Sequence, residues 1–503
     1  MRRRSEALAV ALLRRGVGAE RVCVVALDRG ADPVVATLGV LRAGAAFLVV
    51  DVDLPDRRLA ALARGADVVI TSRTLAPRLA ALGLPGPAVL IDEATAGTPA
   101  MKPPAGTPAM KPPAGTPAIE LPAGTPAIEL PAGVPPRSLA YVGHTSGSTG
   151  TPNAVLIEHR WLHPYLRGIV RDYRLGPDTV ALQLAPPGFD AALRDTFAPL
   201  LAGGRLVVLP RSTLLRPAEF FAALAEHGVN TMLSVTPSFL SFLAAQDGAA
   251  DWLRGLRLVA TTGEPIRPFL AAGGRRLVPG RLVNQYGPTE CTMTTTRFDV
   301  PERPDTTVDL IGVPIEGAAV RLLGTDLEPV PAGAVGELCI AGPGVGRGYA
   351  GRPALTAQRF VPDAAGPPGA RLYRTGDLAR LRPDGNLEYL GRRDRQIKIR
   401  GYRVDPGEVE GALLAHPAVT GAAITAATDA QARIHLVAHL TGDLGGVADA
   451  ALRAYLAQTL PPHMIPRRFA RLNRFPTTRT GKVDRLALAG SPAPLPDPEG
   501  TAR

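Results

Sequence analysis

The chain has few cysteines and no long hydrophobic run. Three cysteines occur among 503 residues, namely Cys23, Cys291 and Cys339, and they lie far apart in the sequence. This number excludes a disulfide-stapled scaffold, and the spacing offers no pair for a zinc site. No run of about 18 uncharged apolar residues occurs, so we expect no membrane-spanning helix and no membrane partner. The sequence therefore predicts a cytoplasmic protein with reduced thiols.

Lysine is almost absent. The chain contains 52 arginines and 4 lysines against 45 acidic residues, which gives a formal net charge of +11. The basic residues are scattered, whereas a nucleic-acid-binding surface clusters them, so no nucleic-acid partner is expected. The apolar stretch after Arg2–Arg4 is cut short by Arg14 and Arg15, with no small-residue cleavage site. An amphipathic helix is predicted there in place of a signal peptide.

The order of strand-like and helix-like segments predicts an α/β protein of several domains. Short β-rich runs at 22–27, 47–50, 67–70, 181–184, 205–209, 231–235 and 256–260 alternate with helical runs, which predicts layered, parallel sheets. Residues 320–390 have short strands with Gly/Pro turns, typical of a small antiparallel β piece. Residues 396–488 again mix strands with helices. We expect a large N-terminal α/β domain over 1–393, a small mobile α+β C-terminal domain over 394–490, and a tail over 491–503.

A nine-residue repeat interrupts the first of these domains. From Ala96 the sequence reads AGTPAMKPP twice and then AGTPAIELP twice. Proline and glycine in every copy block both helix formation and strand pairing, and there is little apolar surface to bury. Residues 96–133 are therefore predicted to be a disordered insert. A tandem duplication in a surface loop explains it better than a binding module.

A glycine- and hydroxyl-rich loop is the most informative feature. The strand-like run from Leu139 leads into Thr145, Ser146, Gly147, Ser148, Thr149 and Gly150. Glycines let backbone N–H groups approach an anion and hydroxyls add further donors, as in a phosphate-binding loop. The spacing is not that of a Walker loop. Taken alone, such a stretch is also compatible with a flexible turn.

This loop resembles the phosphate loop of the adenylate-forming superfamily, specifically of the adenylation domains of non-ribosomal peptide synthetases. Further segments match that family in chain order: 41–48 (LRAGAAFL), 189–190 (FD), 284–290 (NQYGPTE), 336–338 (GEL), 348–349 (GY), 373–377 (YRTGD), 391–401 (GRRDRQIKIRG), 460–466 (LPPHMIP) and 480–485 (TGKVDR). The resemblance extends from about Ser5 to Leu488 except for the repeat. It implies an ATP-dependent ligase that activates an amino acid in the biosynthesis of a peptide antibiotic or related secondary metabolite.

The lysines point to the same site independently. Lys102 and Lys111 lie in the repeat, so Lys398 and Lys482 are the only lysines elsewhere in the chain. Because an ammonium is a compact point charge and a guanidinium is a planar fork, these positions indicate a site that needs the smaller cation. The alternative, two chance survivors of an arginine-rich composition, remains open.

The resemblance assigns roles to particular residues. Lys482 would bridge the substrate carboxylate and the α-phosphate, with Lys398 as a second catalytic lysine and Asp394 as the hinge of the C-terminal domain. Glu290 would hold Mg²⁺, and Asp190 would pair with the α-ammonium of the amino acid. An exposed turn acid is the alternative interpretation of Glu290. The implied reaction joins a carboxylate to AMP, releases pyrophosphate, and then transfers the acyl group to the phosphopantetheine thiol of a carrier protein supplied by another chain.

The same resemblance implies a nucleotide site and a specificity pocket. ATP and AMP would contact Thr145, Ser146, Gly147, Ser148, Thr149, Gly150, Asn284, Tyr286, Gly287, Thr289, Asp377 and Arg392. Within this set, Tyr286 would face adenine, Asn284 the base edge and Asp377 the ribose hydroxyls, although ordinary core packing also explains Tyr286. The amino acid would contact Asp190, Ala191, Arg194, Ser234, Ala260, Thr262, Gln285, Met293 and Thr294, together with Lys482.

Arg194 is unusual for such a pocket, because a buried guanidinium needs a partner. One hypothesis is a polar or acidic substrate side chain with Arg194 as its counter-charge. The alternative is an Arg194 that turns to solvent or pairs with Asp195.

Several departures from the family pattern leave the activity open. Asn153 and Ala154 follow Pro152 where the family has Lys and Gly, Ala192 replaces a small hydroxyl, and Thr262 replaces a glycine. The first change, and a start inside the family's first helix, favour a catalytically impaired adenylation fold that acts as an assembly-line partner. An acyl-CoA ligase is a third alternative, and Asp190 argues against it.

Overall fold

The computed structural model describes residues 1–84, 88–96, 131, 133–147, 152–393, 396–429, 433–477 and 483–490. Within these residues, one seven-stranded sheet has the order β16-β6-β5-β2-β1-β3-β4. Its strands are β1 (Val22–Ala26), β2 (Ala46–Val50), β3 (Val68–Thr71), β4 (Ala88–Leu90), β5 (Leu139–Thr145), β6 (Asn153–Glu158) and β16 (Gly348–Tyr349). The helices of this part are α1 (Arg2–Leu13), α2 (Ala31–Arg42), α3 (Asp56–Leu62), α4 (Ala76–Ala81), α5 (Ile91–Ala94) and α6 (His159–Asp172).

A second, twelve-stranded sheet in the described part of the chain changes from parallel to antiparallel along its width. Its parallel strands are β7 (Val180–Leu182), β8 (Arg205–Val207), β9 (Thr231–Val235), β10 (Leu258–Thr262) and β11 (Arg281–Tyr286). The antiparallel strands are β12 (Thr296–Asp299), β13 (Asp309–Pro314), β14 (Ala319–Leu323), β15 (Val335–Ala341), β17 (Phe360–Pro362), β18 (Arg371–Leu381) and β19 (Leu387–Arg392).

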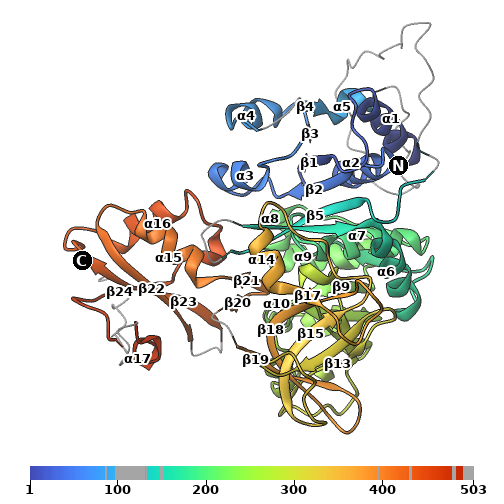
Figure 1. Ribbon diagram of the computed structural model, residues 1–503. Coiled ribbons are helices and arrows are strands. Elements are labelled where there is room, and N and C mark those ends of the chain that lie inside the picture. Colours follow the sequence, from blue (N-terminus) through green and yellow to red (C-terminus); the bar gives the residue numbers. More distant parts are fainter. Residues whose placement is uncertain are drawn as a thin grey trace, which may run out of the picture.

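The helices of this second part are α7 (Ala191–Leu201), α8 (Arg211–Leu214), α9 (Pro217–His227), α10 (Pro237–Ala244), α11 (Ala249–Gly255), α12 (Arg267–Ala271), α13 (Gly274–Leu277) and α14 (Pro353–Arg359), with a 3₁₀ turn at Thr289–Cys291. In Figure 1 the seven-stranded sheet lies above the twelve-stranded one, with α6 and α7 between them.

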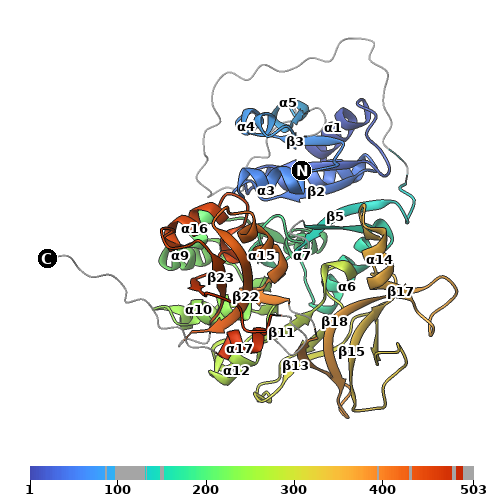
Figure 2. The same cartoon turned by 60° about the vertical axis from the view of Figure 1, so that its left-hand side comes forward.

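The C-terminal elements form a body of their own. They are β20 (Ile397–Ile399), β21 (Tyr402–Val404), α15 (Pro406–Leu414), β22 (Val419–Thr428), β23 (Ile434–Gly442), α16 (Asp449–Leu456), a 3₁₀ turn (Pro462–Met464), β24 (Arg468–Arg471) and α17 (Arg485–Gly490). A separate hydrophobic core, which includes Val409, Leu413, Leu436 and Leu452, holds this body together. The hairpin β20–β21 lies on the side of this body that faces the twelve-stranded sheet (Figure 1), and Figure 2 shows the C-terminal body from a second direction.

The apolar run of β1 explains why this strand is central. Cys23 and Val25 belong to the core shared with the second sheet, whereas Val24 and Ala26 belong to the core on the opposite face with α3. A parallel strand covered on both faces reads as a continuous apolar run, as VCVVA does. The loops at the carboxyl ends of such strands are therefore placed by two packed layers.

The fold class predicted from the sequence is confirmed, including the layered sheets, the antiparallel piece and the C-terminal α+β body. The helix predicted near the N-terminus is present as α1. One prediction was wrong in detail: within the twelve-stranded sheet, antiparallel pairing begins at Thr296 in β12, well before residue 320, and continues the parallel strands directly. The seven-stranded sheet also contains antiparallel pairs, β5 with β6 and β6 with β16. The short strands β12 and β13 are separated by the proline-containing stretch 300–308, which hid their pattern. The predicted disorder of the repeat concerns residues that fall outside the described ones, except Ala96 and Pro131.

No helix in the described ranges is long and apolar enough to cross a membrane.

Candidate active site

The hydroxyl-rich loop connects the antiparallel strands β5 and β6, in which Thr145 lies opposite Asn153. The side-chain hydroxyls of Thr145 and Ser146 are buried and have no hydrogen-bond partner among the described residues. Buried polar groups are normally hydrogen-bonded, so two such groups in one loop indicate a site for a polar ligand. Ser148, Thr149 and Gly150 lie outside the described residues.

Asn153 stands where the resemblance leads one to expect a lysine. Its amide nitrogen Nδ2 donates a 3.3 Å hydrogen bond to the backbone carbonyl of Ser146, and the residue is 8% exposed. The side chain therefore closes the base of the loop and supplies no positive charge to it. A cation for this loop has to come from another segment.

A pocket that contains several of the predicted nucleotide-binding residues lies at the end of β11. It is lined by Gly263, Glu264, Pro265, Asn284, Gln285, Tyr286, Gly287, Asp309, Ile311, Tyr389 and Lys398. The rings of Tyr286 and Tyr389 lie 6.1 Å apart, and the ammonium of Lys398 lies 5.7 Å and 5.6 Å from their respective centres. Burial lowers the pKa of Lys398, and Asp377 partly offsets this effect. A Cβ at Gly287 would lie 2.4 Å from the carbonyl oxygen of Met293, so the turn requires glycine.

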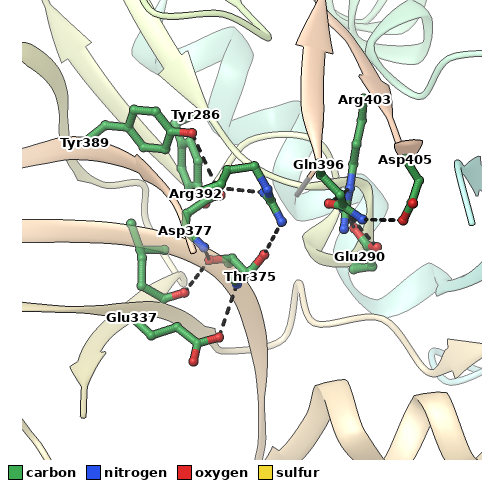
Figure 3. A network of polar contacts seen from close by, with 12 residues as sticks. Tyr286, Glu290, Glu337, Thr375, Asp377, Tyr389, Arg392, Gln396, Arg403 and Asp405 are labelled. Atoms are coloured by element: carbon green, nitrogen blue, oxygen red, sulfur yellow. Dashed lines mark hydrogen bonds and ion pairs between the residues drawn. The ribbon is translucent and has the colours of Figure 1, made fainter. Parts of the chain in front are cut away.

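Asp377 lies at the centre of a polar network beside this pocket (Figure 3). Its Oδ1 accepts a 2.7 Å hydrogen bond from Arg392, and its Oδ2 accepts the hydroxyl of Tyr286. The hydroxyl of Thr375 accepts from the backbone N–H of Asp377 at 2.9 Å. Oδ1 also accepts a long, 3.4 Å hydrogen bond from the hydroxyl of Tyr389. A carboxylate accepts about four hydrogen bonds, so these three leave room for about one more donor.

The Tyr286–Asp377 contact shows that Tyr286 does more than pack in the core. The carboxamide of Asn284, by contrast, forms hydrogen bonds to residues of neighbouring strands. It donates to the carbonyl of Leu310 at 2.8 Å and accepts from Thr261 at 3.2 Å.

Glu290 is fully buried in the turn that Thr289 begins, which excludes its interpretation as an exposed acid. Its carboxylate accepts from the hydroxyl of Tyr349 at 2.8 Å, and Nη1 of Arg403 lies 3.2 Å from both of its oxygens (Figure 3). Burial is the largest influence and would raise the pKa of Glu290, but the charge of Arg403 and the hydrogen bonds to the carboxylate together lower this pKa. The carboxylate is therefore stabilised by a charged residue of the C-terminal body.

The chemistry of Glu290 suits Mg²⁺, a hard cation that often takes one or two protein carboxylates and completes its shell with phosphate and water. No group of three or more His, Cys, Asp or Glu side chains that could hold a metal occurs among the described residues. A magnesium ion here would depend on Glu290 and on substrate phosphates. The guanidinium of Arg403 lies against both oxygens, so the ion and Arg403 are alternatives.

Asp190 lies at the start of α7 and has a buried carboxylate oxygen, Oδ2, with no hydrogen-bond partner in the described part of the chain. Burial raises the pKa of Asp190, although a hydrogen bond from Thr289 and the charge of Arg194 act in the opposite direction. An ionised oxygen without a partner is costly to bury, and a ligand ammonium would satisfy it.

Arg194 is 1% exposed and is surrounded by hydroxyl groups. Its Nε and Nη2 donate to Ser234 Oγ at 3.2 and 2.8 Å, and its Nη1 donates to Thr294 Oγ1 at 2.6 Å. Asp195 accepts from the hydroxyl of Ser234 and forms no direct ion pair with Arg194 within the described residues. Arg194 thus neither turns to solvent nor pairs directly with Asp195.

The other predicted pocket residues lie around this cluster. Gln285 donates to the hydroxyl of Tyr173 at 2.6 Å and accepts from Thr294 at 3.2 Å. Ala260 and Met293 are buried, whereas Ala191 and Thr262 are half-buried. Positive φ angles at Thr292 (59°) and Met293 (69°) shape the loop that precedes Thr294.

Two tyrosines of this cluster were not predicted. The hydroxyl of Tyr165 contacts both Arg194 and Thr294 at 3.3 and 3.1 Å. Tyr165 and Tyr173 come from α6 and its end, where the sequence shows only an amphipathic helix. Asp394 and Lys482 lie outside the described residues, so their roles stay predictions.

Comparison with known proteins places this site in a family. The model described as AMP-binding enzyme matches residues 1–350, and the model described as AMP-binding enzyme C-terminal domain matches residues 408–482. The chain belongs to the AMP-binding enzyme family. The resemblance to adenylation domains seen in the sequence is thereby confirmed.

Relatives among curated proteins are much longer than this chain. Phosphinothricin tripeptide synthetase PhsC of Streptomyces viridochromogenes is 38% identical over 98% of this chain, which spans 43% of that protein. A dimodular nonribosomal peptide synthase of Bacillus subtilis is 35% identical over 98% of this chain, which spans 20% of it. The chain thus corresponds to one part of each relative.

Solved structures of this family share the fold. PA1221, a peptide synthetase protein with adenylation and PCP domains, is 28% identical with a TM-score of 0.74, over 96% of this chain and 78% of that one. The o-succinylbenzoate CoA synthetase of Bacillus subtilis is 21% identical with a TM-score of 0.78, over 96% of this chain and 92% of that one, and this likeness concerns the fold alone.

The first prediction concerns the unpaired oxygen of Asp190. Replacing Asp190 by asparagine removes a buried charge with an unpaired oxygen, which costs stability. In the absence of substrate at pH 7, we therefore expect Asp190→Asn to raise the free energy of unfolding by about 1 kcal/mol and to raise Tm accordingly. The folded-state pKa of Asp190 is raised, so ionisation costs stability above this pKa. The gain should therefore shrink as pH falls through it. Thermal denaturation at several pH values measures both effects.

Asp195→Asn is the matched control. The Asp195 carboxylate accepts from two backbone N–H groups and from Ser234, so an amide N–H placed among these donors should lower Tm. Equal losses of Tm in the two variants would show that Asp190 is an ordinary structural carboxylate.

Proposed function

We propose that this chain activates an amino acid as its aminoacyl adenylate and transfers it to the phosphopantetheine thiol of a carrier protein on another chain. The observation that carries the proposal is the buried Oδ2 of Asp190, which has no partner among the described residues and lies in an AMP-binding enzyme. A ligand with an ammonium group satisfies this oxygen. An acyl-CoA ligase acting on a fatty or aryl acid would leave it unpaired.

In the proposed reaction the substrate carboxylate attacks the α-phosphorus of ATP, the bond to the β-phosphate breaks, and pyrophosphate leaves. Asp190 holds the ammonium, and the hydroxyls of Thr145 and Ser146, which have no partner among the described residues, donate to phosphate oxygens. Tyr286 faces adenine and Asp377 accepts from the ribose. Lys482 neutralises charge that develops between carboxylate and phosphate. Magnesium, when bound at Glu290, would supply further positive charge to the phosphates.

The C-terminal domain would move between the two half-reactions. We place this domain at residues 394–490, with the hinge at Asp394 and the large domain at 1–393. The separate hydrophobic core of the C-terminal body and the separate family model at 408–482 support this division. Hinge motion would bring Lys482 to the nucleotide for adenylation and withdraw it for thiol transfer. The adenylation and PCP domains of PA1221 support a carrier protein as partner.

The pocket around Arg194 favours an amino acid whose side chain ends in a hydrogen-bond acceptor. The guanidinium contacts three neutral hydroxyls, those of Ser234, Thr294 and Tyr165, and no carboxylate within the described residues. A carboxylate or amide oxygen on the substrate would complete the coordination of this charge.

A lysine variant tests the activity. We expect Lys482→Ala to lower the rate of ATP–pyrophosphate exchange by about 100-fold or more, because an aimed charge is lost from the transition state. Lys102→Ala, in the repeat, is the matched control and should leave the rate unchanged. If the unmodified chain catalyses no exchange with any amino acid, this proposal is wrong. The alternative, a catalytically impaired adenylation fold that acts as an assembly-line partner and that Asn153 favours, then replaces it.

An amino-acid panel tests the pocket. Pyrophosphate exchange should be fastest with acidic or amide side chains, and Arg194→Gln should raise KM for them by about tenfold while changing KM for ATP little. A strong preference for leucine or phenylalanine would refute the role of Arg194 as a counter-charge.

A further inference from the structure

We propose that Arg58 and the backbone N–H of Gly147 form one site for the β- and γ-phosphates of ATP, and that Glu408 occupies this site in the present domain arrangement. The inference rests on the proposed function, because it names how the chain would hold its nucleotide.

One carboxylate joins three segments that are far apart in the sequence. Glu408, in the first turn of α15, is fully buried and forms an ion pair with Nη1 of Arg58 in α3. The other oxygen of the same carboxylate accepts a 3.3 Å hydrogen bond from the backbone N–H of Gly147. The side chain of Arg58 is 11% exposed. A single anion from the C-terminal body thus bridges a guanidinium and a phosphate-loop N–H.

The two donors suit a phosphate as well as a carboxylate. A guanidinium binds either group through the same N–H fork, and loop N–H groups are typical phosphate ligands. The buried hydroxyls of Thr145 and Ser146 next to Gly147 have no partner among the described residues and add two donors. Asn153 brings no charge to this loop, so Arg58 supplies the cation. When Glu408 leaves, a mostly buried guanidinium remains that requires an anion.

The same short segment also covers the proposed magnesium ligand. Arg403 places a positive charge on both oxygens of Glu290, while Glu408 places a negative charge on the phosphate site (Figure 3 shows the Arg403–Glu290 pair). Arg403 therefore lies where Mg²⁺ would bind Glu290, and Glu408 lies where a phosphate would bind the loop. This arrangement and bound Mg·ATP exclude each other, so nucleotide binding requires the C-terminal body to move.

Calorimetric titration of the full chain tests the site, with ATP, pyrophosphate and AMP as separate probes in the presence of Mg²⁺. Arg58→Ala should weaken binding of ATP and pyrophosphate by about tenfold or more and leave AMP within about twofold, because AMP lacks the β- and γ-phosphates. The adjacent exposed arginine on the same helix gives the control: Arg57→Ala should match the unmodified chain. Glu408→Gln should tighten pyrophosphate binding severalfold, since the internal competitor loses its charge.

The outcomes separate this inference from the function on which it rests. If the unmodified chain binds neither ATP nor AMP, the proposed function fails. If it binds ATP while Arg58→Ala binds pyrophosphate as well or better, Arg58 is a structural partner of Glu408 and the inference is wrong. Should Arg58→Ala not fold, the double variant Arg58→Ala/Glu408→Ala removes both buried charges, and it should bind pyrophosphate as weakly as expected for Arg58→Ala.

Discussion

Charge burial between the C-terminal body and the two large sheets is the constraint on which this structure depends. Glu290 and Glu408 are both fully buried, and each is held by a guanidinium from the other part of the molecule. Removing one partner of a buried pair leaves a charge that is strongly destabilising. The ion pairs Arg58–Glu408 and Arg403–Glu290 therefore fix the relative position of the two bodies. If the bodies move apart, each buried charge needs a new partner of opposite charge.

The two buried charges of the proposed substrate site, Arg194 and Asp190, are stabilised in different ways. Arg194 is stabilised by neutral hydroxyls, with Asp195 reached through Ser234, so its charge is spread over a network. Asp190 keeps one oxygen without any partner among the described residues. Native proteins keep such a group where a ligand repays the cost of burial. This contrast is the basis for the proposal that Asp190 contacts the substrate and that the cluster around Arg194 selects it.

The sequence predicted the parts of the site that depend on local chain order. Tyr286 ends β11 and its hydroxyl contacts Asp377, so two residues that separate motifs assign to one nucleotide site lie side by side. Arg58 was not found, since in a chain of 52 arginines no single arginine stands out. Lys398 could be singled out because lysine is rare in this chain, and the same reasoning cannot single out an arginine. Tyr165 was missed for another reason: its hydroxyl is placed by packing of α6 against α7, a contact between distant segments.

In the proposed site, the paired charges would make nucleotide binding and domain position a single equilibrium. Glu290 would pair with Arg403 or with a metal ion, and the N–H of Gly147 would donate to Glu408 or to a phosphate, so each state would satisfy the same buried groups. Because one ion pair replaces another, the free energy difference between the states can be small although each pair is strong. A ligand then shifts the population by its differential affinity alone. Strong ion pairs and domain motion would be compatible here, because the ligand would bring a positive charge to Glu290 and a negative charge to Arg58, as Arg403 and Glu408 do now.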